Sequence, residues 1–453
     1  MSSVSISAAA TVLLVLLTSC SNPERDIQRM LDKGTGTVTL PPGVTVLTRE
    51  LRTPPGARNL EIAGSPGTIL KADREFRGRA MLVVQNAQGI RIRDVAFDGS
   101  RPEIGKPAEM PPAASPFLNH FQNNIIALDD SRDVLISNID IREAPAMAIL
   151  AARVKKIRIE KVRIEDSGGR NSRGRNNTTG GILLEEGTED FEVIDCSLKR
   201  VTGNGIWTHS TFLSPRNYRG RIAGNNFETI GRDAVQVGHA NRVRVEGNRG
   251  RFIGFPFDLV DQENQGIPVA VDTAGKVDEG VYTRNHFEEI NGKCFDLDGF
   301  HDGEVSENTC INKGGADYPN GHYALVMNNT NDQMQSEGIV IRDNVFDGTK
   351  FGGIFVIGER HRIFRNKLRN LNRWRCNEGL PGSPCPALPR DPDLTQAGIY
   401  LGDKAERFAP ARGNVIEDNE ISGYRMSTRC VMITPRLSAA DNTIRNNRCS
   451  DSE

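Results

Sequence analysis

Three aspartates that lie close together in the sequence could do chemistry as a group. Asp296 and Asp298 are two residues apart, and Asp272 lies about one repeat earlier in the chain. Neighbouring carboxylates repel one another unless a proton or a cation relieves them, so such a group suits acid–base chemistry on a glycosidic bond or the binding of calcium. A solvated polar surface with no chemical task is the alternative interpretation of the same residues.

Two histidines complete the candidate catalytic set. His209 and His301 occur in the same part of the chain and could hydrogen-bond to the reacting carboxylates. We predict that Asp272 and Asp298 form the acid/base pair and that Asp296, as a third carboxylate, raises the pKa of the acid. Hydrolysis by this set requires no cofactor, whereas the same three aspartates would be the ligands if Ca²⁺ is bound.

Aromatic and polar side chains on both sides of the aspartates could bind a sugar. Trp207, Phe355 and Tyr400 would offer flat rings for stacking if they are exposed, and loops that bury them are the alternative. Arg173, in the glycine-rich stretch 168–179, could bind a uronic acid carboxylate, with a solvated surface arginine as the alternative. The predicted substrate-binding residues are Glu185, Trp207, Gln236, His239, Asn328, Phe355, Arg360, Tyr400 and Arg173.

A repeat positions these residues. A short strand of the form small-Ile-x-Val recurs from 148 to 401, and each copy is followed by a turn and a second run that ends in Asn-x-Phe or a close variant. The gaps between copies range from 23 residues (126 to 149) to 45 residues (354 to 399). A constant strand with variable gaps is typical of a solenoid with loops inserted at one corner. Such short strands cannot bury their apolar side alone, so the coils must stack.

The asparagines of the second motif predict a ladder along one corner of the solenoid. Asparagine adopts the left-handed conformation of a tight turn and can hydrogen-bond to its neighbours. Two positions beyond it, the chain is expected to place an internal stack formed by Phe227, Phe287, Cys310 and Phe346.

The outward side of the first strand is the predicted location of the chemistry. Side chains alternate between faces, so the x residue and the residue after Val point outward. When the strand at 268–271 is aligned on Val269, Asp272 is expected beside Asp298, one coil away at ~4.8 Å. Four insertions, at 100–122, 168–179, 255–266 and 373–396, precede first strands and are predicted to wall this groove.

Two N-terminal segments resemble parts of the pectate-lyase-like β-helix superfamily. Residues 36–43 (GTVTLPPG) look like the first strand of such enzymes, and residues 23–33 (PERDIQRMLDK) are similar to their N-terminal capping helix. The resemblance runs from about residue 23 to the end and implies one all-β domain, a right-handed parallel β-helix with a short capping helix, over 20–453. It implies no particular reaction, because the superfamily holds hydrolases, lyases, epimerases and non-enzymes.

The segment 296–302 (DLDGFHD) invites comparison with the polygalacturonase family, whose site groups aspartates with a histidine. The family's motifs N-T-D, D-D, G-H-G and R-I-K do not occur here in the expected order. No catalytic residue is therefore carried over from that family.

The N-terminus predicts export. An apolar run at 8–17 leads into Leu-Thr-Ser-Cys at 17–20 and is too short to span a bilayer stably. The tetrad resembles the lipobox of bacterial lipoproteins, which implies a signal peptide over 1–19, lipidation of Cys20 and a membrane anchor on the periplasmic or outer side. Ser21, which is not Asp, favours the outer membrane. An ordinary secretory signal is the alternative, and it also predicts an extracytoplasmic protein.

Cysteines and charge narrow the possible partners. Seven cysteines follow Cys20 without any CxxC pair, so zinc is not expected, and an odd number leaves a free thiol. Cys376 and Cys385 are the best candidate disulfide, and the pairing of Cys430 with Cys449 is left open. A net charge of −1 provides no overall attraction to nucleic acid, and a monomer is expected.

These observations favour an exported carbohydrate-active enzyme that hydrolyses a polysaccharide. One alternative is a calcium-dependent lyase acting on a uronic acid polymer, with Lys293, Arg232 or Arg360 as the base. The other is a non-catalytic β-helix that binds glycans or braces the cell envelope.

Overall fold

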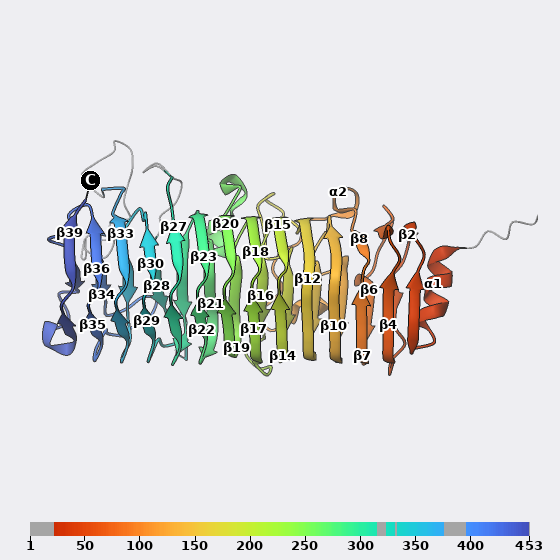
Figure 1. The fold of residues 1–453 in the computed structure, drawn as a ribbon, viewed down its shortest axis with the longest axis horizontal. Coiled ribbons are helices and arrows are strands. Elements are labelled where there is room, and N and C mark those ends of the chain that lie inside the picture. Colours follow the sequence, from red (N-terminus) through yellow and green to blue (C-terminus); the bar gives the residue numbers. More distant parts are fainter. Residues whose placement is uncertain (1–21, 315–322, 331–332, 376–395, 453) are drawn as a thin grey trace, which may run out of the picture.

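The chain winds into a long stack of parallel coils (Figure 1). The computed structural model describes residues 22–314, 323–330, 333–375 and 396–452. All 39 strands within these ranges belong to one hydrogen-bonded system, and each coil pairs in parallel with the coils before and after it. The predicted all-β architecture, a parallel β-helix, is confirmed.

The strands form three stacks along the helix axis, one for each side of a coil. The first stack contains β3 (Leu51–Arg52), β6 (Ala80–Gln85), β9 (Asn124–Asp129), β11 (Ile149–Ala152), β13 (Ile182–Glu185), β16 (Ile206–His209), the first part of β19 (Val235–Glu246), the first part of β21 (Val269–Asp278), β24 (Lys293–Asp298), β28 (Leu325–Asn328), β31 (Ile354–Val356), β34 (Ile399–Leu401) and β37 (Val431–Ile433).

The second stack contains β1 (Gly36–Leu40), β4 (Arg58–Gly64), β7 (Gln88–Arg93), the first parts of β10 (Arg132–Arg142) and β12 (Lys155–Ser167), β14 (Glu189–Ile194), β17 (Asn217–Ala223), the ends of β19 and β21, β22 (Val281–Thr283), β25 (Phe300–His301), β26 (Glu304–Ser306), β29 (Val340–Arg342), β32 (Arg362–Phe364), β35 (Val415–Glu417) and β38 (Thr443–Arg445). The third contains β2 (Gly43–Leu47), β5 (Thr68–Ala72), β8 (Ala96–Asp98), the ends of β10 and β12, β15 (Ser197–Val201), β18 (Asn226–Ile230), β20 (Arg249–Ile253), β23 (His286–Ile290), β27 (Thr309–Ile311), β30 (Val345–Asp347), β33 (Lys367–Leu371), β36 (Glu420–Gly423) and β39 (Arg448–Asp451).

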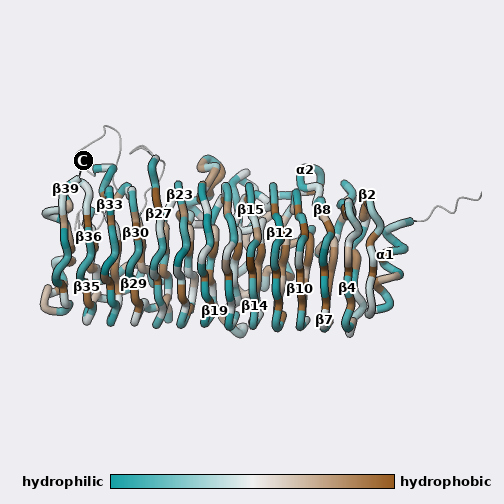
Figure 2. Tube along the Cα trace, viewed as in Figure 1, coloured by the Kyte–Doolittle hydropathy of each residue, from teal (hydrophilic) through white to brown (hydrophobic). Residues whose placement is uncertain are grey.

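Alternation of apolar and polar residues fixes which side of each strand faces inward. In β12, Ile157 and Ile159 are buried, and so are Val162 and Ile164 after a turn at Lys161, whose φ is +53°. The colours along the strands in Figure 2 show the same alternation. The inward side chains of all three stacks form one continuous apolar core.

The predicted asparagine ladder lies at the corner between the second and third stacks. Asn225 accepts a hydrogen bond from the backbone N–H of Cys196 (2.9 Å), and its amide donates to the carbonyl of Val193 (3.0 Å) and to Oδ1 of Asn248 (2.9 Å). At this corner the backbone groups no longer pair between strands. Each asparagine side chain therefore hydrogen-bonds to buried backbone groups that would otherwise lack a partner. The ladder is formed by Asn225, Asn248, Asn285, Asn308, Asn344, Asn366, Asn419 and Asn447, of which only Asn248 was not predicted.

The predicted internal stack two positions later is also present. Phe227, Phe287, Cys310 and Phe346 are buried and follow one another in register, with Gly250 between the first two. The rings of Phe227 and Phe287 are 6.3 Å apart between centroids, and a Cβ at 250 would come within 2.7 Å of Phe287. Glycine at this position therefore makes room for the two large rings on the coils before and after it.

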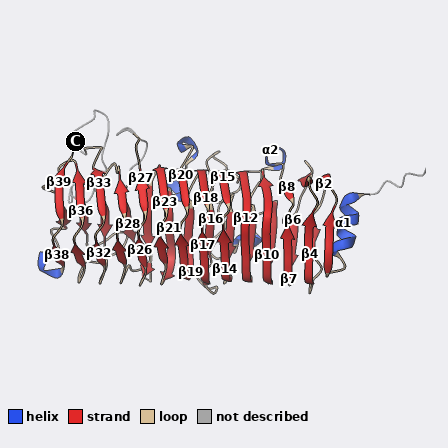
Figure 3. Ribbon diagram, in the orientation of Figure 1, coloured by secondary structure: helices blue, strands red, loops and turns tan. Residues whose placement is uncertain are grey.

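Helices occur only outside the strand stacks of the described residues (Figure 3). The predicted capping helix is α1 (Pro23–Leu31), which starts at Asn22 and buries Ile27 and Leu31 against the first coil. The other α-helices, α2 (Arg101–Ile104) and α3 (Gln262–Gln265), and the 3₁₀ helices Phe117–Asn119, Phe257–Leu259 and Ala439–Asp441 lie in loops. None of the helices in the described ranges is long and apolar enough to cross a membrane.

Two disulfides connect strands of the described chain. Cys430 pairs with Cys449, and Cys294 pairs with Cys310, a bridge that was not predicted. Cys196 is a buried free thiol whose pKa is raised to about 12 by burial. The predicted pair at 376 and 385 and the lipidation site at 20 lie outside the described residues.

Candidate functional site

The outward face of the first stack brings two of the predicted aspartates together. β21 pairs with β24 so that Asp272 and Asp296 are in register, and Gln236 is in register with Asp272 on the other side. The prediction that Asp272 lies beside Asp298 is wrong by two residues. Val269 and Val271 are both buried, and a shift of two residues keeps every side chain on its own face, so the repeat pattern cannot distinguish the two alignments.

The two carboxylates have different partners. Lys293 makes a close ion pair with Asp296 through Nζ and Oδ2. Asp272 accepts a hydrogen bond from the amide of Gln236 (Nε2 to Oδ2, 2.6 Å), and Gln236 accepts one from Asn204 (3.0 Å). Among the described residues no lysine or arginine lies within ion-pair distance of Asp272. Both carboxylates are less than a tenth exposed, so they form the floor of the outward face.

A third carboxylate, which the sequence reading missed, lies just before β19, the strand that pairs with β21. Asp233 is fully buried, 3.4 Å from the guanidinium of Arg232 (NH2 to Oδ2), and its Oδ1 accepts a hydrogen bond from the backbone N–H of Val269 (2.9 Å). The strand pattern assigns an outward direction only to the x residue and to the residue after Val, whereas Asp233 and Lys293 lie three residues before the x position, where the strand begins. Polar residues recur at this strand-start position, and that recurrence is the signal in the sequence that could have identified Asp233 and Lys293.

The surroundings separate the proton affinities of these groups. Burial raises the pKa of Asp272 well above its usual range, the charges of Asp233 and Asp296 raise it further, and the hydrogen bond from Gln236 offsets part of the effect. Burial lowers the pKa of Lys293, but the neighbouring carboxylates more than compensate and raise it overall. The arrangement therefore favours a protonated Asp272 beside an ammonium-paired Asp296.

Asp298 is held by a loop and not by the other aspartates. It is in register with Asn328, and its carboxylate accepts hydrogen bonds from the backbone N–H (3.0 Å) and hydroxyl (2.7 Å) of Thr330. Burial raises the pKa of Asp298, and the two hydrogen bonds from Thr330 oppose that shift. The side chain of Asn328 accepts a hydrogen bond from the backbone N–H of the next residue, Asn329 (2.8 Å).

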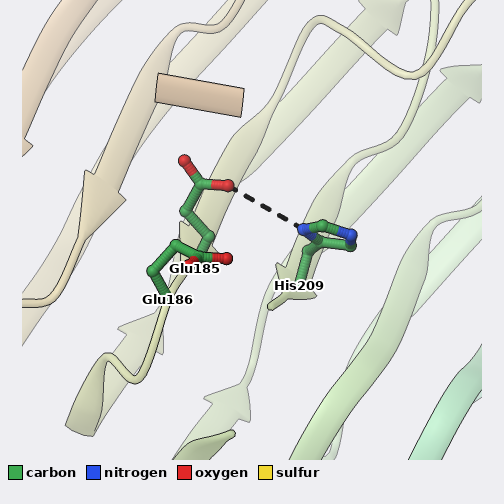
Figure 4. A group of neighbouring side chains, drawn as sticks. All are labelled: Glu185, Glu186 and His209. Atoms are coloured by element: carbon green, nitrogen blue, oxygen red, sulfur yellow. Dashed lines mark ion pairs between the residues drawn. The ribbon is translucent and has the colours of Figure 1, made fainter. Parts of the chain in front are cut away.

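Glu185 and His209 face each other on the same outward side, three and two coils before Asp272 (Figure 4). Nδ1 of His209 lies 3.8 Å from Oε2 of Glu185. Glu185 is fully buried, and its oxygens accept the backbone N–H groups of Phe117 (2.9 Å) and Leu118 (2.7 Å). The prediction of Glu185 as a sugar ligand is therefore wrong, because this carboxylate anchors the 100–123 loop.

The geometry of possible metal ligands differs from the calcium prediction. Within the described ranges, the one group of three whose ligand atoms all lie within 4.8 Å of one another is Glu185, Glu186 and His209. Glu186 is already engaged by the backbone N–H of Thr211 (2.8 Å) and the hydroxyl of Ser214. Both glutamates thus hold loops, and their oxygens are already occupied.

The predicted aromatic platforms are buried. The 100–123 loop covers the early coils, and Phe117 packs edge-on against Trp207 at 4.7 Å between ring centroids. Phe355 and Tyr400 stack on each other at 6.1 Å and are also buried. The loops expected to form walls therefore also cover the surface, and these three rings are not available for stacking. Phe212, which is 57% exposed and lies 4.5 Å from His239 between ring centroids, does reach solvent near this face.

Two predicted residues lie on another side of the coil. His301 belongs to β25 in the second stack, where its Nδ1 is 3.2 Å from Asp278. Arg360 forms a close ion pair with Glu337. The turns that end the first-stack strands carry both residues away from the aspartates, so their assignments to the site are wrong. His239, by contrast, stays close to His209, at 6.2 Å between rings.

Arg173 is occupied by protein carboxylates. Its guanidinium makes two 2.6 Å contacts with Asp261 and one of 2.7 Å with Glu263. These pairs join the 168–179 and 255–266 insertions into one wall. The prediction that Arg173 binds a uronic acid is therefore wrong in this arrangement.

Comparisons with known proteins confirm the right-handed parallel β-helix fold. Residues 82–251 match the family described as "Right handed beta helix region". No curated protein sequence matches the chain. An exopolygalacturonase from Thermotoga maritima is similar in structure, with a TM-score of 0.53, 14% identity, and coverage of 77% of this chain and 87% of that one.

Two further solved structures have the same fold. The tailspike of E. coli bacteriophage HK620, solved in complex with a hexasaccharide, gives a TM-score of 0.60 at 11% identity over 93% of this chain and 75% of that one. The surface adhesin PfbA of Streptococcus pneumoniae gives 0.51 at 14% identity over 78% and 89%. At such identities these similarities show the fold alone.

Proposed function

We propose that this chain is an exported carbohydrate-active enzyme that hydrolyses glycosidic bonds at Asp272 and Asp296. The observation that carries the proposal is the in-register pair of carboxylates on the outward face, one without a cation and one paired with Lys293. In hydrolases, different environments separate the pKa values of two carboxyl groups, so that one acts as the acid and the other as the base or nucleophile.

In this mechanism Asp272 donates a proton to the glycosidic oxygen as the bond to the anomeric carbon breaks. Asp296 attacks the anomeric carbon and forms a glycosyl ester, while the leaving sugar departs with the proton from Asp272. Water then cleaves the ester after Asp272 takes up its proton, which frees Asp296 and restores the protonated Asp272. The ammonium of Lys293 is the counter-ion of Asp296 in the resting state. His209, His239 and Asn328 remain candidate substrate contacts along the same face, and Asp298 shapes the adjoining loop.

Polysaccharide is the proposed substrate class because this fold occurs in an exopolygalacturonase and in a tailspike solved with a hexasaccharide. Export to an oxidising compartment is supported by the disulfides Cys294–Cys310 and Cys430–Cys449. Lipid anchoring through Cys20, at the outer membrane, and a monomeric state remain part of the proposal.

A neutral glycan is favoured over a uronic acid polymer. Lys293 and Arg173 are both paired with protein carboxylates, and Lys293 holds its proton too tightly to serve as the base of an elimination. A substrate carboxylate would also meet the carboxyl groups of Asp272 and Asp296 at the floor of the face.

A glycan panel tests the proposal. Neutral and acidic polysaccharides are incubated with added or chelated calcium, followed by assays for reducing ends and for the ultraviolet absorbance of unsaturated uronates. We expect reducing ends without that absorbance, and a loss of about a hundredfold or more in Asp272→Asn and Asp296→Asn. Asp403 is a buried carboxylate that pairs with Arg436 and lies three coils beyond Asp296. Asp403→Asn is therefore the matched control and should keep full activity.

The other outcomes are equally informative. Absorbance that disappears on chelation would replace this proposal with a calcium-dependent lyase. Binding without turnover across the whole panel would replace it with the non-catalytic glycan-binding function.

A further inference from the structure

Asp233 is a fully buried carboxylate at the start of the strand next to Asp272. Its Oδ1 accepts the backbone N–H of Val269, and its Oδ2 lies 3.4 Å from the Arg232 guanidinium without a hydrogen-bond donor among the described residues. Burying a carboxylate with incomplete hydrogen bonding is costly, so a residue of this kind calls for an explanation beyond packing.

A short path of hydrogen bonds joins Asp233 to Asp272. The backbone N–H of Asp233 donates to Oδ1 of Asn204 (3.3 Å), and the amide of Asn204 donates to Gln236 (3.0 Å). Gln236 in turn donates to Oδ2 of Asp272 (2.6 Å). Three coils thus fix the orientation of one carboxyl group.

The cluster around Asp272 contains more acidic than basic side chains. Three carboxylates share two cations, and each cation is already assigned by geometry: Arg232 lies against Asp233, and Lys293 pairs with Asp296. Asp272 is the remaining carboxyl, and it receives only an amide. Since like charges this close cannot all be ionised, the proton belongs on Asp272.

We infer that Asp233 is a positioning residue of this site, whose buried charge keeps Asp272 in the protonated form that donates the proton. The inference rests on the proposed hydrolysis at Asp272. Asp233 itself touches no substrate, because the strand start and the loops around it exclude solvent.

Every charged group that acts on Asp272 can be named. Asp233 and Asp296 disfavour its ionisation, while Arg232 favours it. Lys293 on β24 is within electrostatic reach, and so is the buried hydroxyl of Tyr282 on β22, whose pKa is raised well above its usual range by burial and which stays neutral. Replacing Asp233 by Asn changes one of these charges and leaves the shape of the site.

The test is the pH dependence of kcat/KM for the full-length protein on the glycan it cleaves. In Asp233→Asn the basic limb of the profile should move to lower pH by about one unit, because one negative neighbour of the acid is gone. In Gln236→Leu the limb should move to higher pH, because the hydrogen bond that favours ionised Asp272 is lost. Asp403→Asn should leave the profile unchanged.

Shifts in opposite directions cannot come from general loosening of the fold. An unchanged limb in Asp233→Asn, or shifts of the same sign in both variants, would overturn the inference. If Asp233→Asn does not fold, a limb in Gln236→Leu that fails to rise overturns it equally.

A titration of the Asp272 carboxyl carbon by NMR, assigned with Asp272→Asn, gives the same comparison without substrate. If that titration moves in Asp233→Asn while no glycan is cleaved, the proposed hydrolysis fails although the coupling between the carboxylates stands. If glycan is cleaved but the titration does not move, the hydrolysis stands and the role of Asp233 is rejected.

Discussion

Lys293 and Asp296 form a largely buried ion pair three residues apart in β24, and Asp296 is at the same time in register with Asp272 on the adjacent coil. One strand therefore supplies both a carboxylate and its counter-ion, while the neighbouring strand supplies a carboxyl group without one. Because of this asymmetry, the two carboxyl groups on the outward face can take different roles in the proposed reaction.

Replacing Lys293 by Met should destabilise the protein as well as inactivate it. Removing one partner of a buried ion pair leaves an uncompensated charge and typically costs about 3–5 kcal/mol. Urea unfolding measures the loss. Lys155→Met is the control, because its pair with Glu189 is exposed and should contribute at most about 1 kcal/mol. Equal effects of the two changes would contradict the burial of Lys293, and Lys293→Met/Asp296→Leu should recover much of the loss.

The asparagine ladder offers a comparison between adjacent residues. Asn225→Ala leaves the buried N–H of Cys196 and the carbonyl of Val193 without partners, at a cost of about 1–3 kcal/mol for each orphaned group. Asn226→Ala, one residue later and exposed, should change the free energy of unfolding by less than about 0.5 kcal/mol. Thermal and urea unfolding of the two variants decide the point, and similar losses would mean that the ladder is not structural.

The repeat made the fold predictable. The inward apolar positions recur along the chain and the corner asparagines recur from Asn225 onward, so both the core stack of Phe227 and Phe287 and the ladder could be read from sequence. Coil spacing could also be predicted, but the exact register at Val269 and Val271 could not, because both residues satisfy the same alternation. That ambiguity of two residues decides whether Asp272 faces Asp296 or Asp298.

The site was less predictable for a different reason. Trp207 and Glu185 point outward as expected, but the 100–123 loop returns over them, and nothing in a strand pattern shows which loop covers which coil. Asp233 and Lys293 lie at strand starts, where alternation no longer tells which way a side chain points. Arg173 illustrates the same limit, because its partners Asp261 and Glu263 are almost ninety residues away in sequence.

His361 should make the fold sensitive to acid. Its ring is fully buried, Nδ1 accepts the backbone N–H of Ile339 (3.1 Å), and Nε2 donates to the carbonyl of Ile357 (2.8 Å). Burial lowers the pKa of His361 to about 4. Between pH 6.5 and about 4 the unfolded chain takes up a proton that the folded protein refuses, so stability is full above 6.5 and falls with pH by about 3 kcal/mol.

The measurement is the free energy of unfolding between pH 7 and about 4.5 for wild type and His361→Gln. Asp272 and Asp233, with raised pKa values, act with the opposite sign and are present in both proteins. The difference in slope therefore isolates His361. Identical slopes would show that the ring accepts a proton without losing its backbone contacts.

The two disulfides should differ in their effect on function. Cys294–Cys310 closes 16 residues and Cys430–Cys449 closes 19, so removal of either should cost about 3 kcal/mol and lower Tm. Cys294 is the neighbour of Lys293, whereas Cys430 and Cys449 lie in the last coil. We expect Cys294→Ala/Cys310→Ala to lower kcat/KM at temperatures where both variants are folded, and Cys430→Ala/Cys449→Ala to leave it unchanged. Equal losses of activity would assign the effect to overall stability.

The register of Asp272 and Asp296 predicts the stereochemistry of hydrolysis. In-register residues on adjacent coils are ~4.8 Å apart, close to the separation of about 5–5.5 Å between the carboxyl groups of retaining glycosidases and short of the ~6.5–9.5 Å that leaves room for a water. Asp296 should therefore attack the anomeric carbon, and the product first formed should keep the substrate's configuration, which NMR of the early reaction shows. In Asp296→Gly, added azide should replace the missing nucleophile and yield a glycosyl azide of the opposite configuration, whereas Asp298→Gly should give none. An inverted first product from the wild-type protein would mean that the carboxyl groups diverge enough to admit water, and Asp296 would then be a general base.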